Sequence, residues 1–358
     1  YILSNKNIVL FSKILLKIAL KLKLPILGLI KKTVFTHFCG GENIKESKKK
    51  IIELGKYNIK TILDYSVEGL NNNVQFQHTY LEILKNLKEA SNNKNIPFCV
   101  FKITGIARFK LLEKLNRKLK LSKEEQEELL LLRRRLNSIC IQASTNNTPI
   151  LIDAEESWIQ NAIDELTEEL MENYNVENVI IYNTVQLYRW DKLAYIKKLH
   201  SKSKNKFKLG LKLVRGAYME KERAYAIKLN QKCLIHDTKE NCDKDYNIAS
   251  KYCVKNINDI SLCFGTHNEQ STEIVIDLMK KHNISSTDER IFFSQLLGMS
   301  DNISFYLGQY NYNVAKYVPY GPVKKVLPYL IRRAEENSSI TGQTNREIIR
   351  IKEAIKKN

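Results

Sequence analysis

The stretch "KLGLKLVRGAY" (residues 208–218) gives the clearest indication of the fold. Its apolar, β-favouring run closes with the charged residue Arg215, followed by Gly216 and, two residues later, Tyr218. Continuous apolar runs of this length are typical of parallel strands that are buried on both faces. A glycine directly after the charged strand end allows the backbone to approach a ligand closely, although a plain tight turn uses the same residues. The stretch predicts a buried strand that ends at a functional edge.

Similar runs recur from Cys99 onward, separated by amphipathic helical stretches such as "NEQSTEIVIDLMKKHN" (268–283). Strands that alternate with helices predict a parallel sheet covered by helices. Eight candidates, with "KCLIHD" as the weakest, predict an α/β fold of the (β/α)8 TIM-barrel type. The other candidates are "FCVFKIT", "PILIDAE", "VENVIIYNTVQLY", "DISLCFGTHN", "RIFFSQLLG" and "NVAKYVPYG".

The remaining parts of the chain read as helical. We expect an N-terminal helical region at residues 1–95, the barrel at 96–345 and a C-terminal tail helix at 346–358. A long charged helical pair, "LLEKLNRKLKLSKEEQEELLLLRRRLNSIC", separates the first two of these strands.

Polar residues close the apolar runs, where a barrel would gather them at one mouth. No single one is diagnostic, and their shared position is the signal. They are Lys102, Asp153, Gln186, Arg215, Tyr218, His267, Gln295 and Tyr317.

Some residues at the strand ends also allow an interpretation that involves no ligand. An ammonium group inside an apolar strand needs a partner, and Asp153 on the next strand is the expected partner of Lys102. Asp153 is also three residues before Glu156, and Thr266 three before Glu269, which is the spacing of helix capping boxes.

The stretch "PYLIRRAEEN" (328–337) carries an organised polar face. In a helix, Tyr329, Arg332, Arg333 and Glu336 fall on one side, and Leu330 and Ile331 on the other. Paired guanidinium groups bind a carboxylate in a bidentate manner, so this face predicts a carboxylate clamp.

Composition and motifs exclude several function classes. The net charge is +19, yet the lysines are spread along the chain instead of clustered, so we expect no nucleic-acid site. The sequence has no P-loop, no HExxH motif and no GxGxxG after a strand, and no cluster of metal ligands. Seven cysteines without metal-like spacing favour a reducing compartment.

The segment "NIVLFSKILLKIALKLKLPILGLIKK" (7–32) is apolar but carries Lys13, Lys17, Lys21 and Lys23, and Pro25 ends its helix. We therefore expect neither a transmembrane helix nor a signal peptide. A helix packed on the core and a helix lying on a membrane interface both remain open.

Taken in order, "FKIT", "LIDAEES", "VQLYRWD", "KLVRGAY", "GTHN", "FFSQLLGM", "YVPYGPV" and "LPYLIRRAEENSS" resemble the proline dehydrogenase family over residues 99–340. The upstream "HFCGGE" and "LDYSVEG" resemble its single-function, mitochondrial-like branch, which lacks a fused aldehyde dehydrogenase domain. The resemblance implies a distorted (β/α)8 barrel, non-covalent FAD, and oxidation of L-proline to 1-pyrroline-5-carboxylate.

The resemblance also implies roles for individual residues. Those expected to bind proline are Lys102, Asp153, Leu213, Tyr218, Tyr317, Tyr329, Arg332 and Arg333, of which Lys102, Asp153, Tyr218, Arg332 and Arg333 form the catalytic set. Those expected at the cofactor are Ala154, Gln186, Lys212, Arg215, Gly216, Ala217, Thr238, Thr266, His267 and Glu336, with Glu336 also holding the arginine face.

The match departs from the family pattern at Met219, where some members have an aromatic residue. It also departs around "CLIHDTKEN", the stretch that contains Thr238. The family passes electrons to membrane quinone. We therefore expect a cytoplasmic, bacterial protein that associates peripherally with the inner face of the membrane through residues 1–30.

Two alternatives stay open. One is another flavin barrel, similar to methylenetetrahydrofolate reductase, which has no use for the Tyr329, Arg332 and Arg333 face. The other is a non-catalytic basic protein that associates with membranes.

Overall fold

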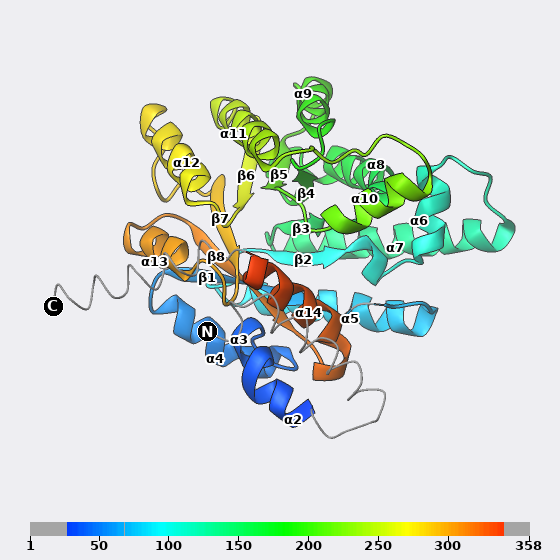
Figure 1. The fold of residues 1–358 in the computed structure, drawn as a ribbon, viewed down its shortest axis with the longest axis horizontal. Coiled ribbons are helices and arrows are strands. Elements are labelled where there is room, and N and C mark those ends of the chain that lie inside the picture. Colours follow the sequence, from blue (N-terminus) through cyan, green and yellow to red (C-terminus); the bar gives the residue numbers. More distant parts are fainter. Residues whose placement is uncertain (1–26, 68, 340–358) are drawn as a thin grey trace.

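The computed structural model describes residues 27–67 and 69–339. Eight parallel strands close into a barrel in chain order, which confirms the predicted fold class. Figure 1 shows them at the centre of the molecule with helices around them. The strands are β1 (Ile59–Tyr65), β2 (Cys99–Lys102), β3 (Ile150–Asp153), β4 (Ile181–Gln186), β5 (Leu209–Val214), β6 (Ile260–Gly265), β7 (Ile291–Leu296) and β8 (Val314–Tyr320).

Helices precede the barrel, connect its strands and follow it. Those before β2 are α2 (Leu27–Ile30), the π-helical turn η2 (Lys31–Phe35), α3 (Thr36–Phe38), α4 (Ile44–Gly55) and α5 (Asn73–Ser91). The connections up to β5 hold η3 (Ile103–Gly105), α6 (Phe109–Asn116), α7 (Lys123–Thr145), α8 (Ser157–Tyr174) and α9 (Lys192–Ser203). The remainder are α10 (Met219–Lys228), α11 (Lys239–Lys255), α12 (Glu269–Lys281), α13 (Asp301–Gln309) and α14 (Val323–Ser339).

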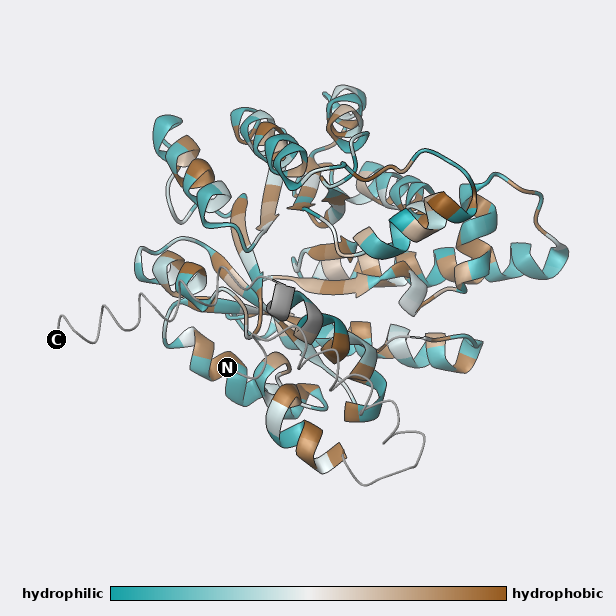
Figure 2. Cartoon of the chain, viewed as in Figure 1, coloured by the Kyte–Doolittle hydropathy of each residue, from teal (hydrophilic) through white to brown (hydrophobic). Residues whose placement is uncertain are grey.

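The apolar residues fall into layers set by the alternation of side chains along each strand. One large cluster lies between the strands and the helices and includes Leu211, Leu213 and Phe264. A smaller cluster, with Phe98 and Tyr182, brings together residues from seven of the strands, all except β5. Figure 2 shows the strands largely hydrophobic and the surrounding helices banded, as expected of helices that bury one face.

The closure of the barrel differs from a regular (β/α)8 arrangement. β1 pairs with β8 over seven residues, from Ile59 opposite Val314 to Tyr65 opposite Tyr320. The N-terminal helix α4, and not the helix that follows β8, packs against these two strands. The helix that follows β8, α14, packs on η2 and α2 instead. This arrangement frees α14 from the outer ring.

Two strand predictions were wrong. The region expected to be helical up to residue 95 contains β1, whose run "IKTILDY" mixes Lys60, Thr61 and Asp64 with apolar residues and so lacks a clear period. The weak candidate "KCLIHD" is not a barrel strand, since Ile235 forms only an isolated bridge with Arg189. Thus the count of eight was correct while one member was misassigned.

Between residues 27 and 339, leaving out residue 68, no helix combines the length and the apolar character that a membrane crossing needs. Residues 7–26 of the segment considered as an interfacial helix (7–32) and the expected tail helix at 346–358 lie outside the described residues.

Candidate active site

A pocket of about 890 Å³ opens at the carboxyl ends of the strands, beneath α14. This volume lies near the upper end of the roughly 300–1,000 Å³ typical of ligand sites. Most of the predicted site residues line it: Lys102, Asp153, Ala154, Gln186, Lys212, Arg215, Gly216, Ala217, Tyr218, Thr266, His267, Tyr317, Tyr329, Arg332, Arg333 and Glu336. Because side chains of α14 line the same pocket as the strand ends, this helix lies over the mouth of the barrel.

Lys212 forms the centre of the pocket floor. Its Nζ donates to a carboxylate oxygen of Asp153 on β3 and, at 2.6 Å, to the hydroxyl of Tyr317 on β8. The ammonium group also lies 4.5 Å from the centroid of the Tyr317 ring. The side chain of Lys212 is only 6% exposed, so these contacts replace water around a charge that would be costly to bury alone.

Asp153, which was expected to pair with Lys102, forms an ion pair with Lys212. Lys102 and Asp153 are neighbours in register, but the bond to Asp153 comes from two strands farther along, across the barrel interior. A second carboxyl, Asp64 at the end of β1, also lines the pocket. Burial raises the pKa of Asp64, while the nearby charge of Lys102 opposes this shift.

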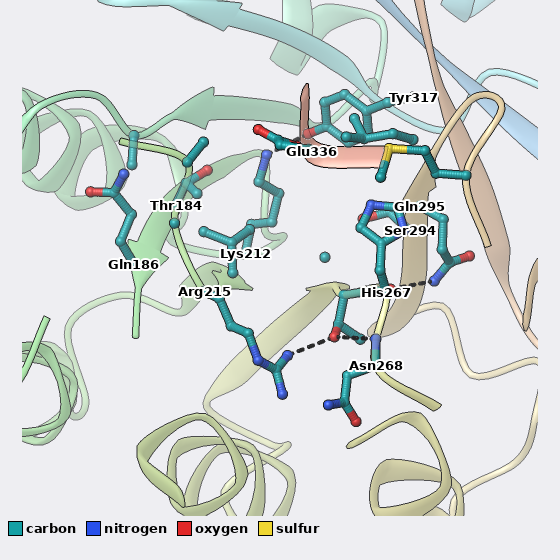
Figure 3. Close-up of a pocket in the computed structure, with 18 of the residues that line it drawn as sticks. Thr184, Gln186, Lys212, Arg215, His267, Asn268, Ser294, Gln295, Tyr317 and Glu336 are labelled. Carbon is teal, nitrogen blue, oxygen red and sulfur yellow. Dashed lines mark hydrogen bonds between the residues drawn. The ribbon is translucent and has the colours of Figure 1, made fainter. Parts of the chain in front are cut away.

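Arg215 is held rigidly at the edge of the pocket. Its guanidinium donates to Asp243 (2.6 Å), to the Thr266 hydroxyl (2.7 Å) and to the Ser271 hydroxyl (2.8 Å), and it stacks 4.3 Å from the centroid of the Tyr246 ring. Figure 3 shows the bond from Arg215 to Thr266 on the pocket wall. The glycine after it has φ +137°, and a Cβ there would lie 2.5 Å from the Tyr188 ring. Gly216 is therefore required for the turn that leads to Tyr218.

Strand β4 presents two polar atoms to the pocket that lack a partner among the described residues. They are Oγ1 of Thr184 and Oε1 of Gln186, both on buried side chains. Figure 3 shows the two residues on the same wall as Lys212 and Arg215.

The polar face of α14 forms the roof. Arg333, which is 6% exposed, donates from Nη2 to Glu336 at 2.6 Å and lies 5.4 Å from the centroid of the Tyr329 ring. Within the described part of the chain, Nε of Arg333 and the hydroxyl of Tyr329 are buried without a hydrogen-bond partner. Both residues line the pocket, so an acceptor that enters beneath α14 can satisfy them.

His267 closes the side opposite β4. Its Nδ1 is 3.0 Å from the hydroxyl of Ser300. Burial, together with the charges of Lys316, Arg333 and Arg215, lowers the pKa of His267 to about 3. The imidazole is therefore neutral at physiological pH and acts as a hydrogen-bonding group, not as a cation.

The capping interpretations of the strand ends are wrong. The residue before α8 is Glu156, and its side chain makes no capping bond, so Asp153 is available to the pocket. The cap of α12 is Asn268, whose side chain accepts from the amide of Ser271. Thr266 instead accepts from Arg215 and from the amide of Asn268, as Figure 3 shows.

Two predicted site residues do not line the pocket. Leu213 follows Lys212 on the same strand, so the alternation of side chains points it away from the interior and into the core beneath the helices. Thr238 caps α11, where its hydroxyl accepts from the amide of Asn241.

Sequence reasoning also missed residues that line the pocket. Leu296 is the last residue of β7 and Met299 follows three residues later, and both supply apolar surface to the pocket. Thr184 precedes Gln186 by two residues on β4, so the period of a strand could have identified it. No comparable signal marked Asp64, because its strand was not recognised.

Glu155 connects the loops that carry two pocket residues. It is 3% exposed and accepts from the amide of Thr104 at 3.0 Å and from the Thr104 hydroxyl. This contact ties the end of β2 to the end of β3, next to Lys102 and Asp153. Burial raises the pKa of Glu155 to about 7, although the bonds from Thr104 oppose the shift.

Comparison with known proteins identifies related chains. Residues 47–346 match the family model described as proline dehydrogenase. The chain is 34% identical over 399 residues to proline dehydrogenase 1, mitochondrial, of Dictyostelium discoideum, covering 99% of this chain and 69% of that protein. It is 30% identical over 311 residues to the carbapenem antibiotics biosynthesis protein CarD of Pectobacterium carotovorum subsp. carotovorum, covering 87% and 80% of the two chains.

Among solved structures, proline utilization A (PutA) from Bdellovibrio bacteriovorus, inactivated by N-propargylglycine, is similar with a TM-score of 0.77 at 20% sequence identity. The likeness covers 87% of this chain and 34% of that chain, so this chain corresponds to about a third of the PutA chain. At this identity the likeness shows a shared fold.

Glu155 generates a prediction about pH. The pKa of Glu155 in the folded protein is about 7, above the ordinary 4.5, so the folded protein holds this proton more tightly than the unfolded chain does. The contribution of protonated Glu155 to the free energy of unfolding is therefore fully present below pH 4.5 and falls as the pH rises towards 7. Glu155→Gln should remove this fall and stabilise the protein by up to ~3 kcal/mol at pH 8. Urea unfolding from pH 4 to 8 measures it. The exposed Glu165→Gln is the control, and an unchanged pH slope in Glu155→Gln would contradict the prediction.

Proposed function

Since this chain belongs to the proline dehydrogenase family and is an oxidoreductase of proline catabolism, we propose that it oxidises L-proline to 1-pyrroline-5-carboxylate with a non-covalently bound FAD. The observation that carries the proposal is one pocket with two kinds of wall. Strand ends supply buried polar groups on one side, and α14 supplies an arginine pair on the other.

The residues present fit a flavin. Thr184 Oγ1 and Gln186 Oε1 are buried polar atoms with no partner in the described chain, and both residues line the pocket. The hydrogen-bonding edge of a heteroaromatic ring would satisfy them. Gln186, Lys212, Arg215, Gly216, Ala217, Thr266 and His267 would hold the cofactor with the backbone near Ala154. When bound, FAD supplies the acceptor for the hydride that leaves the proline ring carbon next to nitrogen.

The chain itself would position the substrate. Arg332 and Arg333 would grip the proline carboxylate together with Lys102, because charge-assisted bonds from fixed donors orient as well as bind. Glu336 holds one guanidinium in place through its 2.6 Å bond to Arg333. Asp153, Tyr218, Tyr317 and Tyr329 would surround the ring, and Leu296 takes the apolar position first expected of Leu213. Holding the carboxylate in this way sets the ring carbon at reacting distance.

The proline amine must be neutral before hydride can leave. His267, which lines the pocket, is neutral but is hydrogen-bonded to Ser300. We therefore do not assign it the role of general base. We propose that the cations of Lys102, Arg332 and Arg333, with exclusion of water beneath α14, lower the pKa of the bound amine. The proton then leaves to solvent before oxidation.

The electrons would pass on to a membrane quinone. We propose that the protein associates peripherally with the inner face of the cytoplasmic membrane through its lysine-rich amino terminus. Basic residues and an apolar surface both favour anionic lipid. Next to that segment, Leu29 in α2 is 67% exposed.

Family membership favours this function over the two alternatives left open by the sequence. A folate reductase has no use for the Tyr329, Arg332 and Arg333 roof. A non-catalytic basic protein would not need partnerless polar atoms buried around a single pocket.

We expect Arg333→Ala to keep its flavin and to lose about 2 kcal/mol or more of transition-state stabilisation, about 30-fold in kcat/KM for proline. Arg333→Lys should recover only part of this, because an ammonium group cannot make a bidentate contact. Bleaching of the flavin absorbance by proline measures the step directly. Lys325→Ala, on the exposed side of α14, is the control. Wild-type kcat/KM in both Arg333 variants would argue against the clamp, and a wild type without flavin would argue against the function.

The amine proposal predicts a pH profile. With saturating proline, kcat should rise with pH through a group below the pKa of free proline, because the bound amine must lose its proton. Removing one cation by Arg332→Gln should move this rise to higher pH. A kcat independent of pH, or an unchanged profile in Arg332→Gln, would refute the proposed effect of the cations.

Membrane association predicts a charge effect. Each lysine near an anionic surface contributes about 1 kcal/mol, so replacing Lys13, Lys17 and Lys21 by Glu should weaken binding to vesicles of anionic lipid by about 100-fold or more. Co-sedimentation measures this binding. Replacing the exposed Lys324 and Lys325 by Glu serves as the control, and equal weakening by both sets would speak against a specific role of the amino terminus.

A further inference from the structure

Thr184 occupies an unusual position on β4. Its side chain is 4% exposed and its hydroxyl has no hydrogen-bond partner among residues 27–67 and 69–339. By the alternation of a strand it points to the same side as Tyr182 and Gln186. Tyr182 packs edge to face against Phe98 within the smaller apolar cluster, and Gln186 ends the strand at the mouth. Thr184 therefore precedes Gln186 by two residues on the wall of the pocket, where Figure 3 labels both side chains.

The neighbouring side chain cannot account for this hydroxyl. Lys212 is opposite Thr184 in the pairing of β4 with β5, but its Nζ is bonded to Asp153 and Tyr317. A hydroxyl buried without a partner destabilises the folded state, so a valine, which has the same shape, would give a more stable barrel. Because Thr184 lines the pocket, a molecule bound there can supply the missing partner.

We infer that the Thr184 hydroxyl donates a hydrogen bond to the flavin ring, a role that rests on the function proposed above. Residues two apart on a strand are separated by about 6.6 Å, so Thr184 and Gln186 contact different atoms along one planar ring. A donor to the ring strengthens FAD binding. It also favours the electron-rich reduced ring over the oxidised one, and therefore sets the reduction potential of the bound cofactor.

The chain provides a matched comparison in Thr61 on β1. Its side chain is fully buried and its hydroxyl also lacks a partner in the described residues, yet it does not line the pocket. Thr61→Val and Thr184→Val make the same chemical change in two strands of one barrel. Of the two changes, only the second falls on a residue that lines the pocket.

The experiment compares wild type, Thr184→Val, Thr184→Ser and Thr61→Val. Without FAD, Thr184→Val should unfold at the same temperature as wild type or higher, because a penalty has been removed. Its dissociation constant for FAD, from the quenching of flavin fluorescence, should rise about tenfold. Its midpoint potential should fall by about 30 mV, which is a tenfold change for a two-electron couple. Thr184→Ser keeps the hydroxyl and should stay close to wild type, and Thr61→Val should change neither FAD affinity nor potential.

Several results would overturn the inference. Thr184→Val with wild-type affinity and potential would show that the hydroxyl does not contact the ring. A loss of stability without FAD in Thr184→Val would show that the hydroxyl has a structural partner instead. Equal shifts of potential in Thr61→Val and Thr184→Val would show a general effect on the barrel. A wild-type protein that binds no FAD would overturn the proposed function together with this inference, whereas the first three results leave that function intact.

Discussion

The buried ammonium group of Lys212 links three strand ends of the barrel. Its bonds to Asp153 and Tyr317 join β5 to β3 and β8 across the interior, where no backbone pairing connects these strands. A charge in this position is stable only with both partners present, since each lost contact would leave a desolvated ion. The two contacts of Lys212 thus fix the floor of the pocket and keep one end of the barrel interior polar. Other pocket residues are arranged around this floor.

The polar groups around that floor divide into satisfied and unsatisfied ones. Arg215 and Gln295 have partners within the protein and serve as rigid walls. Thr184, Gln186, Tyr329 and Arg333 each keep a buried atom without a partner in the described chain, on β4 and on α14. The first pair suits a planar cofactor and the second an anionic substrate, which would place the two molecules face to face. Binding of such molecules would regain the stability that the protein forgoes at these atoms.

The sequence was most informative where a residue type and a strand end coincided. Arg215 could be placed because it follows an apolar run, and the arginine pair of α14 because it falls on one face of a helix. Lys212 was identified only through the family resemblance. Leu213 was misplaced because an apolar residue on a doubly buried strand carries no sign of which side it faces, and only the register separates it from Lys212. β1 was missed because Lys60, Thr61 and Asp64 hide its apolar pattern. The pair of Lys212 and Asp153 could not be foreseen, since contacts across a barrel join residues that are distant in the chain.

The position of α14 has a consequence for the order in which the molecule is made. The outer place beside β1 and β8 is filled by α4, which is synthesised early, and the arginine pair comes near the end of the described chain. During synthesis all eight strands therefore leave the ribosome before Arg332 and Arg333 do, and the barrel can close without them. On the proposed mechanism, a nascent chain at that stage would have its framework but would lack the arginine pair that binds the substrate. Activity would then appear only after the segment that carries Arg332 and Arg333 has been synthesised.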